Sequence, residues 1–145
     1  MKTLTVPGEL PSLPEIGGFV MAAAADAGLD RKRSYRLRLA VDEIATNIVN
    51  YGYARHQRVG QIVVSAGVVG DTLTVVLEDT APPFNPLNQP LPTKEELGDP
   101  LEERPIGGLG IFLAIENVDE FRYEPVDGGN RNVFVIRLDE PPASS

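Results

Sequence analysis

The sequence predicts an α+β protein, a two-layer α/β sandwich with a mostly antiparallel mixed sheet and helices on one face. Two pairs of β-rich segments joined by tight glycine turns indicate antiparallel strands. Three segments with helical apolar spacing lie before and between those pairs and indicate one covering layer. With 145 residues, 42% of them hydrophobic, the chain is expected to form a single domain over residues 1–145.

The first part of the chain is expected to form an edge strand and two helices. Residues 1–6 alternate weakly, as a short edge strand does. Apolar residues recur at helical spacing from Leu10 to Ala27, and Gly28 is suited to end that helix. Asp30 can cap a second helix that runs to about Tyr53. The apolar stripe predicted for the second helix consists of Tyr35, Leu37, Leu39, Val41, Ile44, Ile48 and Val49.

The two hairpins are predicted from β-rich runs on either side of glycine turns. The first pairs residues 61–68 with residues 72–78. The second pairs residues 120–124 with residues 132–138 about the turn Asp127-Gly128-Gly129-Asn130. Strand pairs of this kind favour an antiparallel arrangement of the sheet.

A long proline-rich loop is expected between the hairpins. The stretch from Thr80 to Pro105 contains seven prolines, a density that leaves room for little more than a turn at residues 93–97. Loops of this length inside a compact domain are usually either functional or disordered. The loop ends at Gly107-Gly108-Leu109-Gly110, which opens a helix predicted over residues 111–117.

Composition excludes several classes of function. The formal net charge of −8 argues against direct nucleic-acid binding, because phosphate binding needs a cationic surface. The chain has no cysteine, no apolar run of membrane-spanning length and no apolar signal-peptide core, so a cytoplasmic protein without membrane contact is expected. Five basic residues within eight positions form either a solvated helix start or a docking patch for an acidic protein. They are Arg31, Lys32, Arg33, Arg36 and Arg38.

One pair of positions on the second predicted helix carries candidate chemistry. Glu43 and Asn47 are four residues apart, so their side chains lie one above the other on one helix face. A carboxylate can orient a water molecule or a hydroxyl group, and an amide oxygen can ligate a hard cation such as Mg²⁺. Taken alone, the spacing also fits an ordinary solvated face.

Two later segments supply what a nucleotide site would still need. Asp79 ends the second strand of the first hairpin and can accept a hydrogen bond from an exocyclic amine such as adenine N6. The glycine loop before the last helix frees backbone N–H groups at a helix N-terminus, where the dipole favours phosphate. The proline-rich loop between them is placed to fold over a nucleotide as a lid. The glycine loop matches neither the Walker pattern nor the Rossmann fingerprint, so the indication comes from the combination.

In this order the motifs resemble those of the GHKL ATPase/kinase superfamily, which has the Bergerat ATP-binding fold. Within it the chain resembles the small anti-sigma-factor serine/threonine protein kinases of bacterial partner-switching systems. VDEIATNIVNYGY resembles the N box, LEDTAPPFNP the first glycine box and PIGGLGIFLA the second. The resemblance covers nearly the whole chain. One departure is Ala81, where the first glycine box normally has glycine. Its methyl group either tightens the expected adenine pocket or weakens ATP binding.

The resemblance implies roles for the matched positions. Glu43 would be the general base, Asn47 would ligate Mg²⁺, and Asp79 would read adenine. Asn50, one turn beyond Asn47, is a further candidate for contact with the phosphates or the purine. Arg104 would neutralise charge on the γ-phosphate, and Lys94 is the alternative candidate for that role. The remaining nucleotide-binding positions that the resemblance implies are Ala81, Phe84, Gly107, Gly108, Leu109 and Gly110.

The activity implied is that of a Mg·ATP-dependent protein kinase. It would phosphorylate a STAS-domain anti-anti-sigma protein on serine or threonine and sequester a sigma factor or another regulator, and the resemblance favours a homodimer. The alternative is a non-catalytic nucleotide-binding or docking module, which Ala81 favours. A histidine kinase is disfavoured, because there is no room for a helical phosphoacceptor region and the single histidine, His56, is expected in a surface loop.

Overall fold

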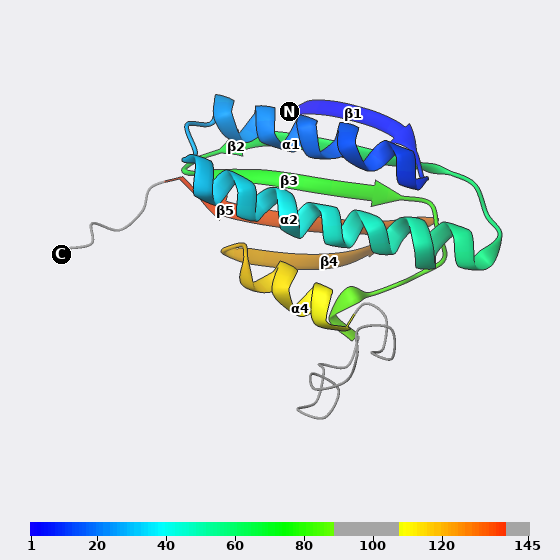
Figure 1. Cartoon of the computed structure of the whole chain (residues 1–145). Coiled ribbons are helices and arrows are strands. Elements are labelled where there is room, and N and C mark those ends of the chain that lie inside the picture. Colours follow the sequence, from blue (N-terminus) through cyan, green and yellow to red (C-terminus); the bar gives the residue numbers. More distant parts are fainter. Residues whose placement is uncertain (89–107, 139–145) are drawn as a thin grey trace.

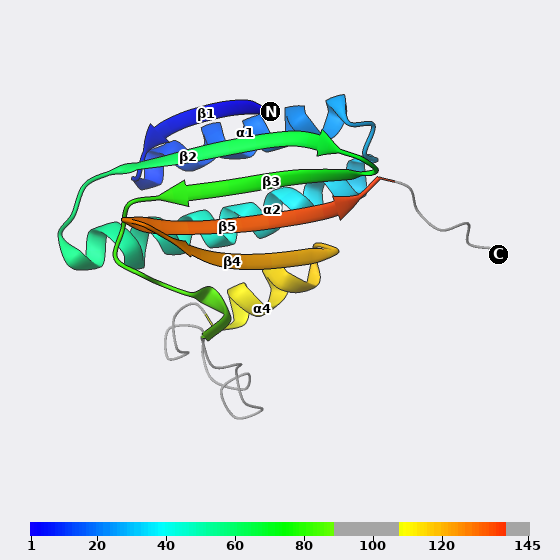
Figure 2. The same cartoon turned by 180° about the vertical axis from the view of Figure 1, so that it is seen from behind.

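A computed structural model of the chain describes residues 1–88 and 108–138 and folds them into two layers (Figure 1). A five-stranded sheet of order β1-β2-β3-β5-β4 forms one layer, and every strand pair in it is antiparallel. The described helices all lie on one face of this sheet, as the view from behind in Figure 2 also shows. The predicted α+β sandwich is therefore confirmed. The sheet over the described residues is antiparallel throughout rather than mixed.

The elements follow the predicted order. The strands are β1 (Lys2–Pro7), β2 (Gln61–Val69), β3 (Thr72–Asp79), β4 (Glu120–Val126) and β5 (Gly129–Arg137). The long helices are α1 (Leu13–Asp26), α2 (Arg31–Asn47) and α4 (Gly108–Glu116), and short helical turns lie at Leu10–Ser12, Ile48–Tyr53, Ala54–His56 and Pro86–Asn88. Among the described residues, no helix has the length and hydrophobicity of a membrane-spanning segment. The predicted turn at residues 93–97 lies outside the described residues.

Local signals set the start of α2. Gly28 has a positive φ of 80° just after α1, a conformation that glycine adopts without a steric penalty. Asp30 then caps α2, because its Oδ1 accepts a hydrogen bond of 2.8 Å from the Arg33 N–H. Both predictions are confirmed.

The buried stripe of α2 is narrower than the sequence predicts. Leu37, Val41 and Ile44 are 1% exposed or less and pack against the sheet. Tyr35 and Leu39 were predicted in the same stripe, but they are 55% and 43% exposed. The reason is geometric, since positions two residues away from Leu37 point about 200° around the helix from it.

The turn between β4 and β5 is shorter than predicted. Only Asp127 and Gly128 form it, with Gly128 at a φ of 77°. β5 begins at Gly129, so Asn130 belongs to the strand and not to the turn. Asn130 lies opposite Asp79 of β3 in the strand register. This difference determines the geometry of the candidate site.

Candidate functional site

A cavity of about 270 Å³, its mouth included, lies where α2 passes over the ends of β3 and β5. It brings together Asn47, Asp79, Ala81 and Phe84 of the predicted site residues. Its interior has room for about one water molecule, so a larger ligand requires the walls to move apart. The residues that line it are Ile44, Asn47, Ile48, Gly52, Asp79, Ala81, Phe84, Pro86, Asn130 and Asn132.

Asp79 supplies a buried hydrogen-bond acceptor to this cavity. The side chain is 5% exposed, and its Oδ1 accepts hydrogen bonds from the Ala81 N–H at 2.9 Å and from Asn130 Nδ2 at 2.8 Å. Its Oδ2 is buried and has no hydrogen-bond partner among the residues that the structure describes. Burial raises the pKa of Asp79, while the two hydrogen bonds act in the opposite direction. A ligand that donates an N–H group here would satisfy the remaining oxygen.

Asn130 organises the segment that follows Asp79, and sequence reasoning missed it. Its Nδ2 donates to Asp79 Oδ1 and, at 3.2 Å each, to the carbonyls of Ala81 and Pro82. Its Oδ1 accepts from the Phe84 N–H at 3.0 Å and from the Tyr123 hydroxyl. One buried amide thus holds the loop after β3 against β4 and β5.

A signal for Asn130 is present in the sequence. Residues of β5 alternate, and Phe134 and Ile136 are buried against the helices. Counting back by two places Asn132 and Asn130 on that same face, where a polar side chain calls for an explanation. The β-rich run that predicts this strand starts at Asn132 and leaves Asn130 in the predicted turn, so the alternation within the predicted strand does not reach Asn130.

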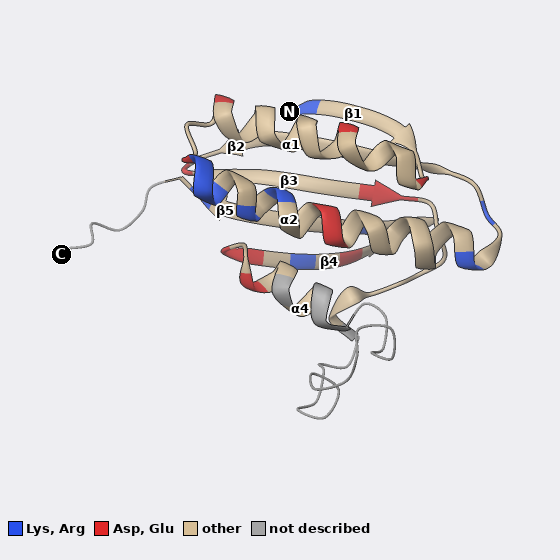
Figure 3. Cartoon of the chain, viewed as in Figure 1, with Lys and Arg blue, Asp and Glu red and all other residues tan. Residues whose placement is uncertain are grey.

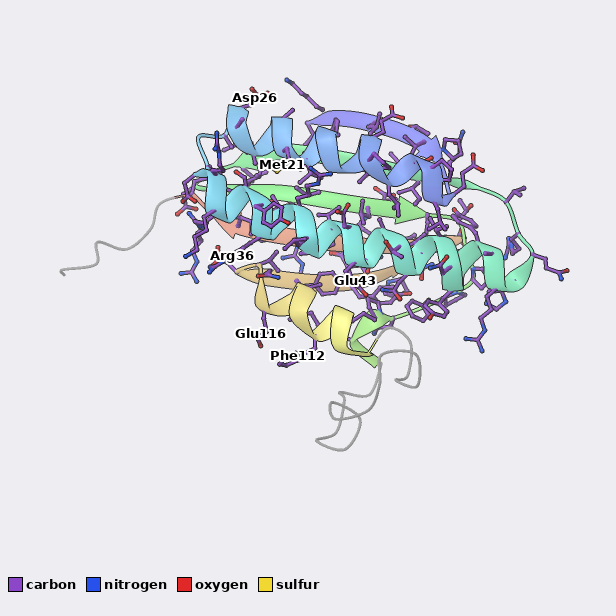
Figure 4. The ribbon with its side chains drawn as sticks, viewed as in Figure 1. Met21, Asp26, Arg36, Glu43, Phe112 and Glu116 are labelled. Atoms are coloured by element: carbon purple, nitrogen blue, oxygen red, sulfur yellow. The ribbon has the colours of Figure 1, made fainter. Side chains whose placement is uncertain are left out.

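Glu43 and Asn47 meet as their spacing predicts. Asn47 Nδ2 donates to the Glu43 carbonyl at 2.7 Å and lies 3.3 Å from Glu43 Oε1. Asn47 is 4% exposed and lines the cavity, whereas Glu43 is half-buried on the side of α2 next to α4 (Figure 4). With its donor used inside the helix, Asn47 keeps Oδ1 as the acceptor that a hard cation would use.

The helix continues beyond Asn47 as a π turn, Ile48–Tyr53, which the sequence did not predict. Such turns insert an extra residue and are frequent at functional sites. Ile48 and Gly52 line the candidate cavity, whereas Asn50 and Tyr53 line a separate groove near β1. Asn50 is therefore not brought together with Asn47 and Asp79.

Tyr53 lines the separate groove near β1 and fixes the backbone just after Asp79 from there. Its hydroxyl donates to the Gln61 carbonyl at 2.7 Å and accepts from the Thr80 N–H at 2.9 Å. The ring lies between Gly8 and Gly60, where an added Cβ would approach ring carbons to 2.5 Å on either side. We refer to Gly8, Tyr53 and Gly60 as the tyrosine clamp. It fixes the residue that follows Asp79.

The methyl group of Ala81 faces Gly52 of the π turn. A Cβ added to Gly52 would lie 2.9 Å from Ala81 Cβ, closer than two methyl groups approach in proteins. Ala81 is 3% exposed. The methyl group that departs from the usual glycine box is thus matched by a missing side chain on the facing helix.

We expect Gly52→Ala to destabilise the domain by about 1–3 kcal/mol, because the two methyl groups would overlap in a packed region. The variant Ala81→Gly should lose about 0.8 kcal/mol for its buried methyl. In the double variant the overlap disappears, so urea unfolding should reveal a favourable coupling between the two changes. Strictly additive losses would contradict this packing.

The remaining predicted positions lie on or near the same end of the fold. The Phe84 ring stacks on Tyr51 with centroids 6.0 Å apart and an interplanar angle of 14°. Gly108, Leu109 and Gly110 form the first turn of α4, which packs against α2. Gly107, Arg104 and its rival Lys94 lie outside the described residues. His56 lies in an exposed turn, as predicted.

The basic cluster is divided between two roles (Figure 3). Arg33 forms an ion pair with Asp119 at 3.4 Å and donates to the Arg137 carbonyl, tying α2 to β5. Arg38 lies 3.8 Å from Asp42. Only Arg31, Lys32 and Arg36 are exposed. Of the two alternatives for this cluster, a docking patch would therefore consist of these three side chains.

Comparisons with known proteins agree with this geometry. A family model described as histidine kinase-like ATPase domain matches residues 6–136. A curated relative, the serine-protein kinase RsbW of Bacillus licheniformis, is 28% identical over 130 residues, which cover 82% of this chain and 76% of the relative. The serine-protein kinase RsbW of Listeria innocua is 29% identical over 124 residues, which cover 79% of this chain and 75% of that relative.

Solved structures share the fold. The chain matches the crystal structure of the RsbU and RsbW domains of a Mycobacterium tuberculosis protein with a TM-score of 0.64 and 20% identity. The match covers 97% of this chain but 34% of that one, so the chain spans about a third of its length. A histidine kinase domain from Erythrobacter litoralis matches with a TM-score of 0.55 and 16% identity, over 88% of this chain and 60% of that chain.

The family match extends from the last part of β1 to the last part of β5 and includes every described residue of the candidate cavity. The resemblance to the GHKL superfamily is confirmed by this match and by the RsbW relatives. The chain belongs to the histidine kinase-like ATPase domain family, of the GHKL type.

Proposed function

We propose that this chain is a single-domain, ATP-dependent protein serine/threonine kinase of the anti-sigma-factor type. The observation that carries the proposal is the buried, unpartnered Asp79 Oδ2 in a cavity that also contains Asn47, itself in contact with Glu43. An adenine amine would give that oxygen its hydrogen bond. The family match and the relatives named serine-protein kinase support the same reading.

Glu43 is the proposed general base. Its carboxylate accepts the proton of a serine or threonine hydroxyl as that oxygen attacks the γ-phosphorus of ATP. The bond from the γ-phosphorus to the bridging oxygen breaks, and ADP leaves with that oxygen. The hydrogen bond from Asn47 Nδ2 at 3.3 Å orients the Glu43 carboxylate for this role.

Asn47 fits a Mg²⁺ site that the nucleotide largely completes. Mg²⁺ in nucleotide sites commonly takes one or two protein oxygens together with phosphate oxygens and water, so one amide oxygen is a sufficient contribution. The hydrogen bond from Nδ2 to the Glu43 carbonyl holds the amide in place and leaves Oδ1 available. When bound, Mg²⁺ would neutralise charge on the phosphates.

The first turn of α4 is the proposed phosphate site. The first N–H groups of a helix have no partner within it, and the dipole favours an anion at that end. Gly108 and Gly110 lie in this turn, which belongs to a helix that packs against α2. Gly107 and Arg104 would complete the site from the preceding loop.

The proposed acceptor is a STAS-domain anti-anti-sigma protein, and the proposed second partner is a sigma factor or another regulator. The exposed Arg31, Lys32 and Arg36 on α2 offer a basic surface to an acidic partner. We further propose that the protein acts as a cytoplasmic homodimer.

Incubation with labelled ATP, Mg²⁺ and the STAS proteins of the same genome tests this function. The expected result is an acid-stable phosphoester on a serine or threonine of one STAS protein, which does not form when a chelator is present from the start to remove Mg²⁺. The narrow cavity and Ala81 favour a second candidate, a non-catalytic module. Calorimetric binding of Mg·ATP without transfer to any STAS protein would support the module. No binding at millimolar ATP would exclude the kinase.

A further inference from the structure

Asn132 places a second unpartnered polar group in the cavity. The residue is 2% exposed, lies on β5 opposite Leu77 and lines the cavity together with Asp79. Its Oδ1 is buried and, like Asp79 Oδ2, has no hydrogen-bond partner among the described residues. Buried side-chain amides are normally hydrogen-bonded, because an unmade bond in the interior lowers stability.

Burial alone does not explain why the Asn132 side chain lacks hydrogen bonds, because Asn130 is equally buried and forms them. Asn130 lies two residues earlier on the same face of the same strand, and its amide makes hydrogen bonds at both ends. Those bonds fix which way the Asn130 amide points. No side-chain hydrogen bond within the described part of the chain fixes Asn132, so its amide can turn either its donor or its acceptor toward the cavity.

We propose that Asn132 is a second base-reading residue, whose Nδ2 donates to N1 of adenine while Asp79 Oδ2 accepts from the N6 amine. The inference rests on the proposed function. The Watson–Crick edge of adenine presents the N6 donor beside the N1 acceptor, so a carboxylate acceptor beside an amide donor is complementary to it. Guanine presents an oxygen in place of the amine, which would face the Asp79 carboxylate. The two residues together therefore favour adenine over guanine.

If Asn132 binds the base, its replacement should change protein stability and ATP affinity in opposite directions, which a purely structural role would not produce. Replacing Asn132 by leucine removes an unpartnered buried amide and keeps similar volume, so the nucleotide-free protein should melt at the same or a higher temperature. The same change should weaken ATP binding. Stability and affinity are thus expected to move in opposite directions.

The test compares ATP with 1-deaza-ATP, in which a C–H group replaces N1, by calorimetry with Mg²⁺. The wild type should bind ATP roughly fivefold more tightly than the analogue, the value of one net hydrogen bond. Asn132→Leu should bind both equally and with the weaker affinity. Thr74→Val serves as the matched control and should keep the wild-type ratio, because Thr74 alternates along β3 with the core residues Leu73 and Val75 and so lies on the face of the sheet away from the core.

Purine riboside triphosphate, which lacks the N6 amine, should bind more weakly than ATP to the wild type and to Asn132→Leu alike, because Asp79 remains.

A wild-type protein that binds ATP and 1-deaza-ATP equally overturns the inference, whether or not the variant folds. An unchanged ratio in Asn132→Leu, or a lower melting temperature with unchanged affinity, also overturns it. In each of these cases ATP still binds, so the proposed kinase function stands although the role of Asn132 fails. If no ATP binding is detected, both the kinase function and the role of Asn132 are excluded.

Discussion

Gly129→Ala is expected to destabilise the domain by at least about 3 kcal/mol and to abolish nucleotide binding. A Cβ at this position would lie 1.9 Å from the carbonyl oxygen of Asp79 and 3.1 Å from the Cα of Thr80. Backbone cannot yield as a flexible side chain does. β5 is held on both sides here, since Gly129 is paired with Val126 of β4 and its neighbour Asn130 with Asp79 of β3. Relief of the clash would separate Asn130 from Asp79 and open the cavity.

Urea unfolding followed by circular dichroism measures this effect, and calorimetry with ATP measures the loss of binding. Gly18→Ala is the matched control, because Gly18 lies in α1 and an added Cβ meets no atom within 4 Å. That control should gain about 0.5–1 kcal/mol from helix propensity. A Gly129→Ala protein as stable as the wild type would show that β3 and β5 are not this close.

Glu43→Gln is expected to slow phosphoryl transfer by about 10²–10⁴-fold while leaving the affinity for ATP nearly unchanged. Glutamine has the same size and its oxygen can still accept the hydrogen bond from Asn47 Nδ2, which is 3.3 Å from Glu43 Oε1. It cannot take a proton from the attacking hydroxyl. Glu43→Ala should show the same separation of binding from transfer.

Single-turnover transfer to the STAS acceptor, with ATP affinity measured in parallel, tests the role of Glu43. Asp42→Asn offers a neighbouring control, since Asp42 is a half-buried carboxylate that lies 3.8 Å from Arg38 and does not line the cavity. That control should transfer phosphate at a rate close to that of the wild type. Undiminished transfer in Glu43→Gln would remove Glu43 from the mechanism.

Local signals in the sequence were sufficient for the parts of the fold that depend on neighbours along the chain. Gly28 and Asp30 marked the helix boundary, and the spacing of Glu43 and Asn47 predicted their contact, because these features need only helical geometry. The exposed Tyr35 and Leu39 mark the limit of such reasoning. Apolar type alone does not decide which face of a helix meets the sheet.

The cavity walls formed by Asp79 and Asn130 depend on contacts between segments that are distant in the sequence. Asn130 and Asp79 are 51 positions apart, and their hydrogen bond exists only because β5 crosses back to pair with β3. A local pattern therefore predicts Asp79 at a strand end but not the amide that holds it. Similarly, Ala81 reads as a departure from a motif until Gly52 is seen to face it.

The tyrosine clamp bears on how this domain can change over evolutionary time. Gly8 and Gly60 each leave space for the ring of Tyr53, so these three positions, from two segments of the chain, are expected to be inherited as one unit. A side chain at position 8 or 60 becomes tolerable only after the ring has been lost. Loss of the ring also removes the hydroxyl that holds Thr80. We therefore expect lineages of this domain to keep all three residues or to replace them together.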